Sequence, residues 1–79
     1  MMSVGDIVRL NNQGQPARLV LDVAPRSIES VIEQPPGTTA LILELWTSDE
    51  PDGPSMESYA KVMANGQIGF VWLYECEEL

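Results

Sequence analysis

Apolar and polar residues alternate, or apolar residues run together, in several short stretches of the chain that end at Gly, Pro or Asn. Short runs of β-prone residues between turn residues are typical of strands. Such runs in one short chain favour an all-β fold, a small, strongly bent antiparallel barrel whose closure removes exposed edges. The sequence predicts five strands, at about positions 5–10, 17–23, 40–46, 59–64 and 67–73.

The last two predicted strands form the clearest local unit. Asn65-Gly66 separates them, and both residues of this pair tolerate the positive φ of a type I′ turn. The pair therefore predicts a C-terminal β-hairpin. One of the two Trp, both Tyr and the only Phe lie between Ser58 and Tyr74, the segment that contains this hairpin, and this segment should hold much of the available core volume.

Residues 24–39 carry two conflicting patterns. Ile28, Val31 and Ile32 have the spacing of about two helical turns capped at Ser27, but all three are β-branched and suit a short or irregular strand equally well. We predict an extended loop with some local structure for this stretch.

Two further stretches are predicted to lack strands. Residues 47–58 are acidic and rich in Pro and Gly, which indicates a second long loop. The last residues, from Tyr74 on, are expected to form a turn that packs Cys76 or Leu79 over one end of the barrel.

Length and charge limit the classes of function. Seventy-nine residues are expected to form one domain, 1–79. Twelve acidic residues against four basic ones give a net charge of −8, which disfavours nucleic acid and anionic membranes as partners because both attract Lys and Arg. The first residues lack the pattern of a signal peptide, and no apolar run approaches the roughly 18 residues of a membrane span. We expect a protein that is not secreted.

No set of residues matches a catalytic or cofactor-binding signature. The chain has no His, so its serines and its single cysteine, Cys76, lack the base of a nucleophilic pair, and a Cys/His zinc site is excluded. Glu residues flank Cys76 and are expected to raise the pKa of its thiol. The acids of residues 49–57 lack the spacing of a calcium site. The sequence therefore predicts no enzyme, no cofactor and no metal.

Two predicted strands carry more apolar residues than a small barrel can bury. Residues 41–46 are apolar on both faces except at Glu44, and residues 68–74 are apolar on both faces throughout. Contiguous exposed apolar area is typical of protein–protein contacts. The outer surface would present Ile42 and Trp46 beside one of two sets, either Ile68, Phe70 and Trp72 or Gly69, Val71 and Leu73.

We predict a protein interface on this surface, formed with a partner or with a second copy of the chain. The alternative is that residues 24–39 fold over the surface and cover it. The residues assigned to the interface are Ile42, Trp46, Ile68, Phe70 and Trp72.

Three segments carry a resemblance to a known family. They are Val4-Gly-Asp-Ile-Val-Arg9, Arg18-Leu-Val-Leu21 and the closing Asn65-Gly-Gln-Ile-Gly-Phe-Val-Trp-Leu-Tyr74, which acids follow. These segments resemble small SH3-like barrel proteins encoded by tailed bacteriophages, including phages of cyanobacteria. The resemblance implies a five-stranded SH3-like barrel and a viral origin, and it brings no functional residues with it. The acidic loop at 47–57 departs from the family's pattern.

Two hypotheses of function follow. The first is a non-enzymatic interaction module, a small virion or assembly component of a phage, which docks through its apolar strand face and is found in the host cytoplasm or the virion. The second is an acidic regulator that binds a basic host protein, such as a polymerase or nuclease, by presenting carboxylates like a nucleic-acid backbone. The acids assigned to the second hypothesis are Asp49, Glu50, Asp52, Glu57, Glu75, Glu77 and Glu78.

Overall fold

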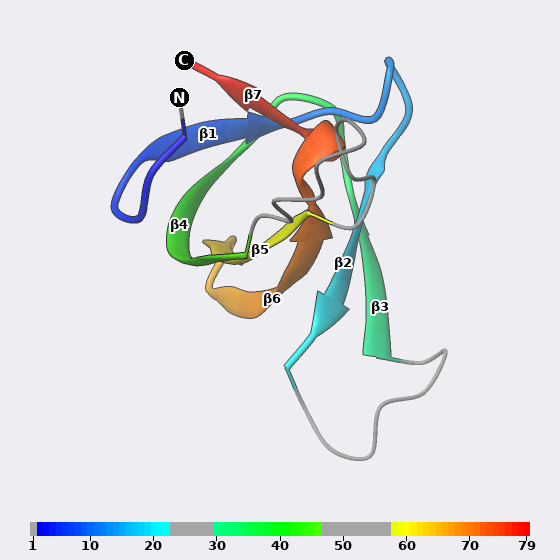
Figure 1. The fold of residues 1–79 in the computed structure, drawn as a ribbon. Coiled ribbons are helices and arrows are strands. Elements are labelled where there is room, and N and C mark those ends of the chain that lie inside the picture. The colour runs from blue at the N-terminus through cyan, green and yellow to red at the C-terminus, as the bar shows by residue number, and fades with distance from the viewer. Residues whose placement is uncertain (1, 23–29, 47–57) are drawn as a thin grey trace.

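Seven strands form one curled antiparallel sheet in the computed structural model, which describes residues 2–22, 30–46 and 58–79 (Figure 1). Their order across the sheet is β3-β2-β6-β5-β4-β1-β7. The strands are β1 (Ile7–Leu10), β2 (Ala17–Leu21), β3 (Val31–Gln34), β4 (Thr38–Trp46), β5 (Tyr59–Ala64), β6 (Gln67–Trp72) and β7 (Cys76–Glu78), with the 3-10 helix η2 (Leu73–Glu75) before β7.

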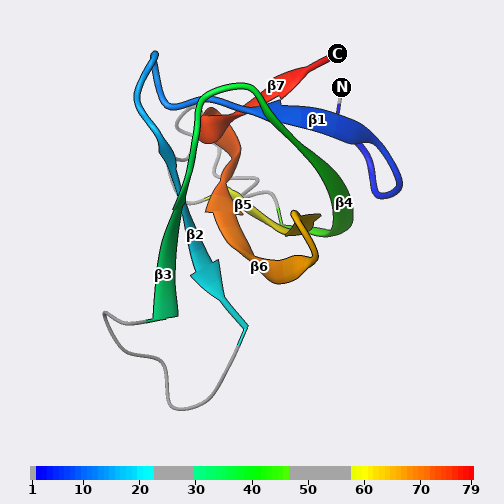
Figure 2. The ribbon, with the colours of Figure 1, turned by 180° about the vertical axis from the view of Figure 1, so that it is seen from behind.

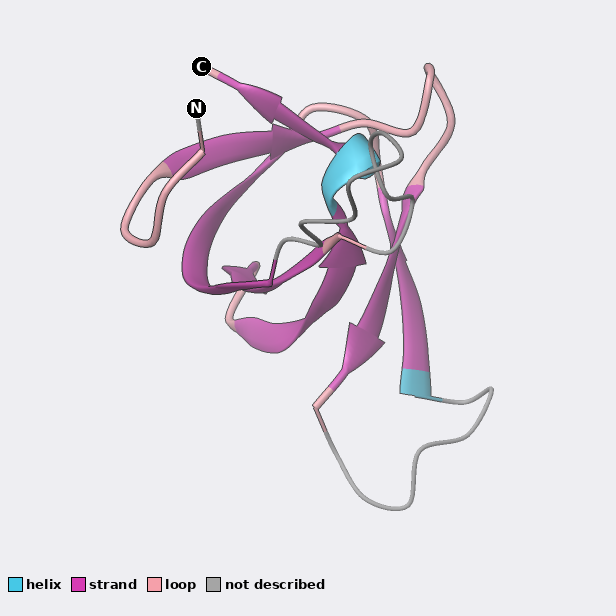
Figure 3. Cartoon of the chain, in the orientation of Figure 1, coloured by secondary structure: helices cyan, strands magenta, loops and turns pink. Residues whose placement is uncertain are grey.

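The sheet bends into a half-barrel. Seen from both sides, β1, β4, β5 and β6 curve around a common interior, whereas β2 and β3 extend away from it as a hairpin (Figures 1 and 2). The only helical structure in the described chain is short and close to strand ends (Figure 3). The all-β, antiparallel part of the prediction is therefore confirmed. Within the described residues, no helix has the length and hydropathy needed to cross a membrane.

The prediction of five strands is wrong, because β3 and β7 are strands as well. β3 pairs with β2, from Val20↔Val31 to Ala17↔Gln34, in a segment for which the sequence predicted a loop. β7 pairs with β1 where a turn was predicted. The two strands have four and three residues. So few residues show no periodicity of their own, and pairing with a neighbour decides their conformation.

The predicted C-terminal hairpin is confirmed as β5 and β6. Asn65 and Gly66 connect the strands with φ values of 52° and 77°, as a type I′ turn requires. The Nδ2 group of Asn65 also donates a hydrogen bond of 2.9 Å to Oε1 of Gln34. This bond joins the turn to β3, so the hairpin that extends from the half-barrel is tied to it.

The core lies on the inner face of the curled sheet. Alanine alternates with a larger aliphatic residue along β2, β4 and β5, as is typical of the interior of small barrels. Cys76 belongs to this core, as predicted, but Leu79 is 67% exposed and does not pack over the barrel end. The buried apolar residues are Val8, Leu10, Ala17, Leu19, Ala40, Ile42, Ala60, Val62, Ala64, Val71 and Cys76.

A β-bulge in β4 changes which side chains face outward. The register against β5 shifts between Ile42 and Glu44, so Leu43 is the extra residue. Before the bulge Ile42 points into the core, where it is 1% exposed, and after it Glu44 and Trp46 point outward. The assignment of Ile42 to the outer interface is therefore wrong. Strict alternation along β4 would have placed Ile42 and Trp46 on one face.

Gly69 allows β2 to lie close to β6. The two strands meet at the pairs Val20↔Phe70 and Leu21↔Gly69. A Cβ atom at Gly69 would lie 2.6 Å from the backbone oxygen of Val20 and 2.8 Å from Cγ of Leu19. Because no side chain fits there, glycine sets the distance between the β2–β3 hairpin and the rest of the sheet.

Candidate binding groove

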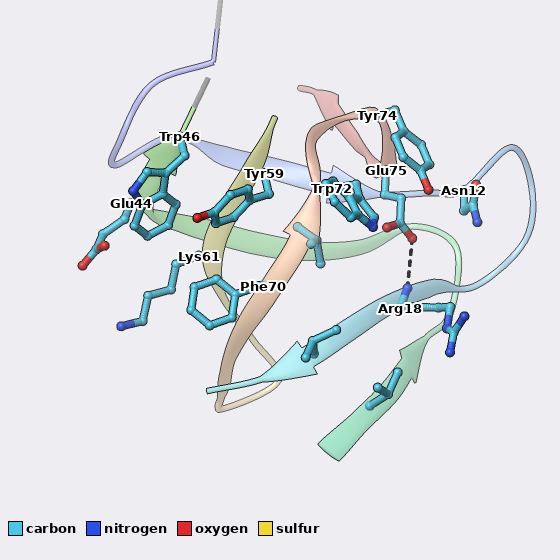
Figure 4. A pocket seen from close by; sticks show the side chains of 13 residues that line it. Asn12, Arg18, Glu44, Trp46, Tyr59, Lys61, Phe70, Trp72, Tyr74 and Glu75 are labelled. Atoms are coloured by element: carbon cyan, nitrogen blue, oxygen red, sulfur yellow. Dashed lines mark hydrogen bonds between the residues drawn. The ribbon is translucent and has the colours of Figure 1, made fainter. Parts of the chain in front are cut away.

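Four aromatic side chains meet on the outer face of β4, β5 and β6, and we call them the aromatic cluster: Trp46, Tyr59, Phe70 and Trp72 (Figure 4). Strand register brings them together, because Trp46 is opposite Tyr59 and Tyr59 is opposite Trp72. Trp46 and Tyr59 stack with ring centroids 4.8 Å apart. Phe70 and Trp72 approach Tyr59 edge-on, at 6.1 and 6.4 Å. Both arrangements are favourable for aromatic rings.

This outer surface remains accessible in the described chain. Trp46 is 38% exposed, and Ile68 and Trp72 are each 43% exposed, whereas Phe70 is half-buried. The structure thus selects the set Ile68, Phe70 and Trp72 from the two that the sequence left open. Val71 of the other set is buried in the core.

The aromatic cluster borders an open groove with a volume of about 710 Å³. β2 and β3 contribute Arg18, Val20 and Val31 to it, and Tyr74 and Asn12 lie at the same end as Trp72 (Figure 4). A groove of this size, with an apolar lining and a few polar groups, is typical of ligand and peptide sites. The remaining lining residues are Glu44, Lys61, Val71 and Glu75.

The described part of residues 24–39, which begins at Ser30, borders the apolar surface and leaves it accessible. Of that stretch, Val31 lies in β3 and lines the groove beside the aromatic cluster without burying it. Ile32 pairs with Leu19 in the same hairpin. Ile28 and the proposed cap at Ser27 lie outside the described residues.

Glu75 is a buried acid at one end of the groove. It is 1% exposed, and its Oε2 accepts a hydrogen bond of 3.0 Å from the backbone N–H of Arg18. Its backbone oxygen accepts a second bond, of 2.8 Å, from the N–H of Asn11. A buried carboxylate requires a donor such as the Arg18 N–H, and this bond ties η2 to β2. The Asn11 bond ties η2 to the residue that follows β1. The assignment of Glu75 to an exposed acidic surface is therefore wrong.

The other acids of that surface are divided between described and undescribed parts of the chain. Glu77 and Glu78 are exposed on β7, and Glu77 accepts a hydrogen bond of 2.7 Å from Nδ2 of Asn11. The four remaining acids lie outside the described residues: Asp49, Glu50, Asp52 and Glu57. Within the described ranges, no group of His, Cys, Asp and Glu is arranged to hold a metal ion.

A salt bridge spans the other end of the groove. Nζ of Lys61 on β5 lies 3.0 Å from Oδ2 of Asp22, just beyond the end of β2. The hydrogen bond and the charge of Asp22 raise the pKa of Lys61 above its ordinary value, and Glu44 adds to this effect. Lys61 therefore stays protonated, and its positive charge is balanced by the carboxylate of Asp22. With Glu44 added, this end of the groove carries a small excess of negative charge.

Cys76 is an inert thiol in the core. Its Sγ donates a hydrogen bond of 3.7 Å to the backbone oxygen of Trp72. Burial, and secondly the charge of Glu75, raise the pKa of Cys76 to about 12. The predicted direction is confirmed, but burial rather than the row of acids is the main cause. The raised pKa means that this group stabilises the fold fully below pH 9.0, the ordinary value of the thiol, and that its contribution is lost as the pH rises toward 12.

We expect Cys76 of the folded chain to react with a disulfide reagent at pH 8 about 100- to 1,000-fold more slowly than in denaturant, because so little thiolate is present. The absorbance of the released thiol measures both rates on the same protein. Equal rates in the two conditions would contradict the burial of Cys76.

The predicted interface omits several residues of the groove. Tyr59 could have been assigned from the sequence, because it begins a predicted strand. The sequence did not show, however, that Tyr59 pairs with Trp46. Tyr74 follows the strand on which Phe70 and Trp72 were assigned. No pattern in the sequence indicated that β2 and β3 line the groove, since β3 was not predicted as a strand.

Comparisons of the chain with protein-family models, with curated proteins and with solved structures find no match.

Proposed function

We propose that this chain is a non-enzymatic protein-interaction module that docks onto a larger protein through its groove. The observation that carries the proposal is the aromatic cluster, which lies on an accessible face of the sheet although the core is filled by other residues. Trp and Tyr are enriched at the centres of protein interfaces because they offer a large, rigid contact area. Four aromatic rings in mutual contact form an apolar patch, and exposed apolar patches are typical of interaction sites.

An SH3-like barrel is the fold that we propose for the module. A strongly bent antiparallel sheet supports it, together with a last strand, β7, that pairs with the first strand, β1, directly after a 3-10 turn. In this proposal β2 and β3 form a hairpin inserted between the first two barrel strands, β1 and β4. The insertion adds one side of the groove to a five-stranded barrel.

The specific form of the proposal is a phage protein that belongs to the virion or assists its assembly. The resemblance of three segments to small phage proteins supports this form, and the docking partner would then be a capsid or tail protein. The regulator that mimics nucleic acid has less support, because Glu75 is buried and Glu77 already accepts a hydrogen bond from Asn11.

The proposal is tested by binding to particles of the phage that encodes the chain. Added chain should co-sediment with particles stripped of it, and Trp72→Ala should weaken this binding at least about 10-fold, since a central aromatic residue contributes most of the affinity. Leu79→Ala is the matched control, because Leu79 is also exposed and apolar but lies outside the groove.

Two results would contradict the proposal. One is a chain that is monomeric in sedimentation velocity at high concentration and absent from purified particles. The other is equal binding of Trp72→Ala and Leu79→Ala, which would place the contact elsewhere.

A further inference from the structure

We infer that the partner places a basic side chain, Arg or Lys flanked by apolar residues, on the Trp46 end of the groove. This inference rests on the proposed function and names the chemistry of the partner. Three observations lead to it: the ring surface available at Trp46, the charge around it, and the charge of the whole chain.

Trp46 offers the ring surface that a cation requires. It is 38% exposed even though it stacks on Tyr59 at 4.8 Å. A guanidinium or ammonium group within about 6 Å of such a ring is attracted by its electron-rich face, and Trp is the strongest of the aromatic residues in this respect. Two stacked rings also give an adjacent apolar surface for the methylene groups of the same side chain.

The charges around Trp46 favour a cation as well. Glu44 precedes Trp46 by two residues on the same outer face of β4 and is exposed. Lys61, which is opposite Glu44 on β5, is paired with Asp22 at 3.0 Å. Glu44, Lys61 and Asp22 together carry two negative charges and one positive charge. Arg18 lies at the other end of the groove, beside Glu75 (Figure 4).

The described charges polarise the groove. Glu44, Asp22 and Lys61 leave one excess negative charge at the Trp46 end, whereas Arg18 and Glu75 carry one charge of each sign at the other end. The negative end of the groove is therefore the end at Trp46.

The same charges argue against a second copy of the chain as the occupant. A net charge of −8 makes two copies repel, and the chain has only four basic residues, of which Lys61 is already paired. Glu44 is exposed, so its carboxylate is accessible to a partner and has no role in the core. A heterologous segment that is basic and apolar is the occupant that satisfies both the rings and the acids.

The experiment uses short capped peptides of Leu, Ala and Gln that differ at one position, which is Arg, Gln or Glu. Binding to the full chain is followed by Trp fluorescence at low and high salt. At low salt the Arg peptide should bind about 10-fold more tightly than the Gln peptide, and the Glu peptide most weakly, as a cation–π contact reinforced by carboxylates predicts. High salt should reduce this ratio.

Three variants locate the cation. Trp46→Leu, which keeps an apolar side chain, and Glu44→Gln should each reduce the Arg-to-Gln ratio to about 3-fold or less. Glu77→Gln is the matched control, because it removes one charge from β7 and keeps an acceptor for Asn11; it should leave the ratio unchanged.

Equal affinity for the Arg and Gln peptides, no binding of any peptide, or equal effects of Glu44→Gln and Glu77→Gln would each overturn the inference. None of these results would remove particle binding that depends on Trp72, so failure of the inference can be told from failure of the proposed function.

Discussion

Replacing Ile42 by Ala is expected to lower the free energy of unfolding by about 2–5 kcal/mol, the range for truncation of a large aliphatic residue in a packed core. Ile42 is 1% exposed and lies among the core side chains of the half-barrel. The change leaves a cavity that strands paired on both sides of β4 are poorly able to close. Urea unfolding followed by Trp fluorescence measures the loss.

Ile68→Ala is the matched control, since it removes the same atoms from an outer position that is 43% exposed. Its effect on stability should stay near the range of about ±0.5 kcal/mol that surface changes show. If the two variants were equally stable, Ile42 would have to face outward, and the bulge in β4 would be absent in solution.

Gly69→Ala is expected to destabilise the fold by about 1–3 kcal/mol, the usual cost of overpacking. Glycine to alanine in a strand would otherwise stabilise by about 0.5–1 kcal/mol, because alanine loses less backbone entropy on folding. Here the new Cβ would lie 2.6 Å from the backbone oxygen of Val20, and a backbone atom moves only with its strand. The steric cost therefore exceeds the entropic gain. The same urea titration decides the sign.

Gly37→Ala is a comparison in which a steric clash is not the cause of destabilisation. Nothing lies within 4 Å of a Cβ at Gly37, but its φ of +92° strains any other residue. The two variants should differ in local structure: Gly69→Ala should shift the amide signals of β2 and β6, and Gly37→Ala only those near its turn. A Gly69→Ala protein as stable as the original would mean that β2 and β6 are further apart.

Local patterns in the sequence were sufficient to predict the β5–β6 hairpin, because the turn residues and the two flanking runs indicate the same structure. Asn65-Gly66 fixed the β5–β6 hairpin, because positive φ at both positions leaves few other connections. β4 was also predicted, as its nine residues form one β-prone run. The outward positions of Phe70 and Trp72 followed from the same alternation once the structure had chosen between the two faces of β6.

The remaining features depend on contacts that no local pattern encodes. The bulge at Leu43 becomes visible only when β4 is paired with β5, and it moves Ile42 from the predicted interface to the core. Glu75 belongs to an acidic run that suggests solvent, yet the N–H of Arg18, 57 positions away, holds it inside. β3 is a strand because β2 lies beside it. One side of the groove was therefore missing from the sequence-based prediction.

The attachment of the β2–β3 hairpin has a consequence for how the protein can bind. β2 meets β6 at two residue pairs, and Ala17 and Leu19 of β2 are fully buried in the core. Moving the hairpin outward would expose these apolar side chains to water, which is unfavourable. The width of the groove is thus set before a partner arrives, and little conformational entropy is lost on docking.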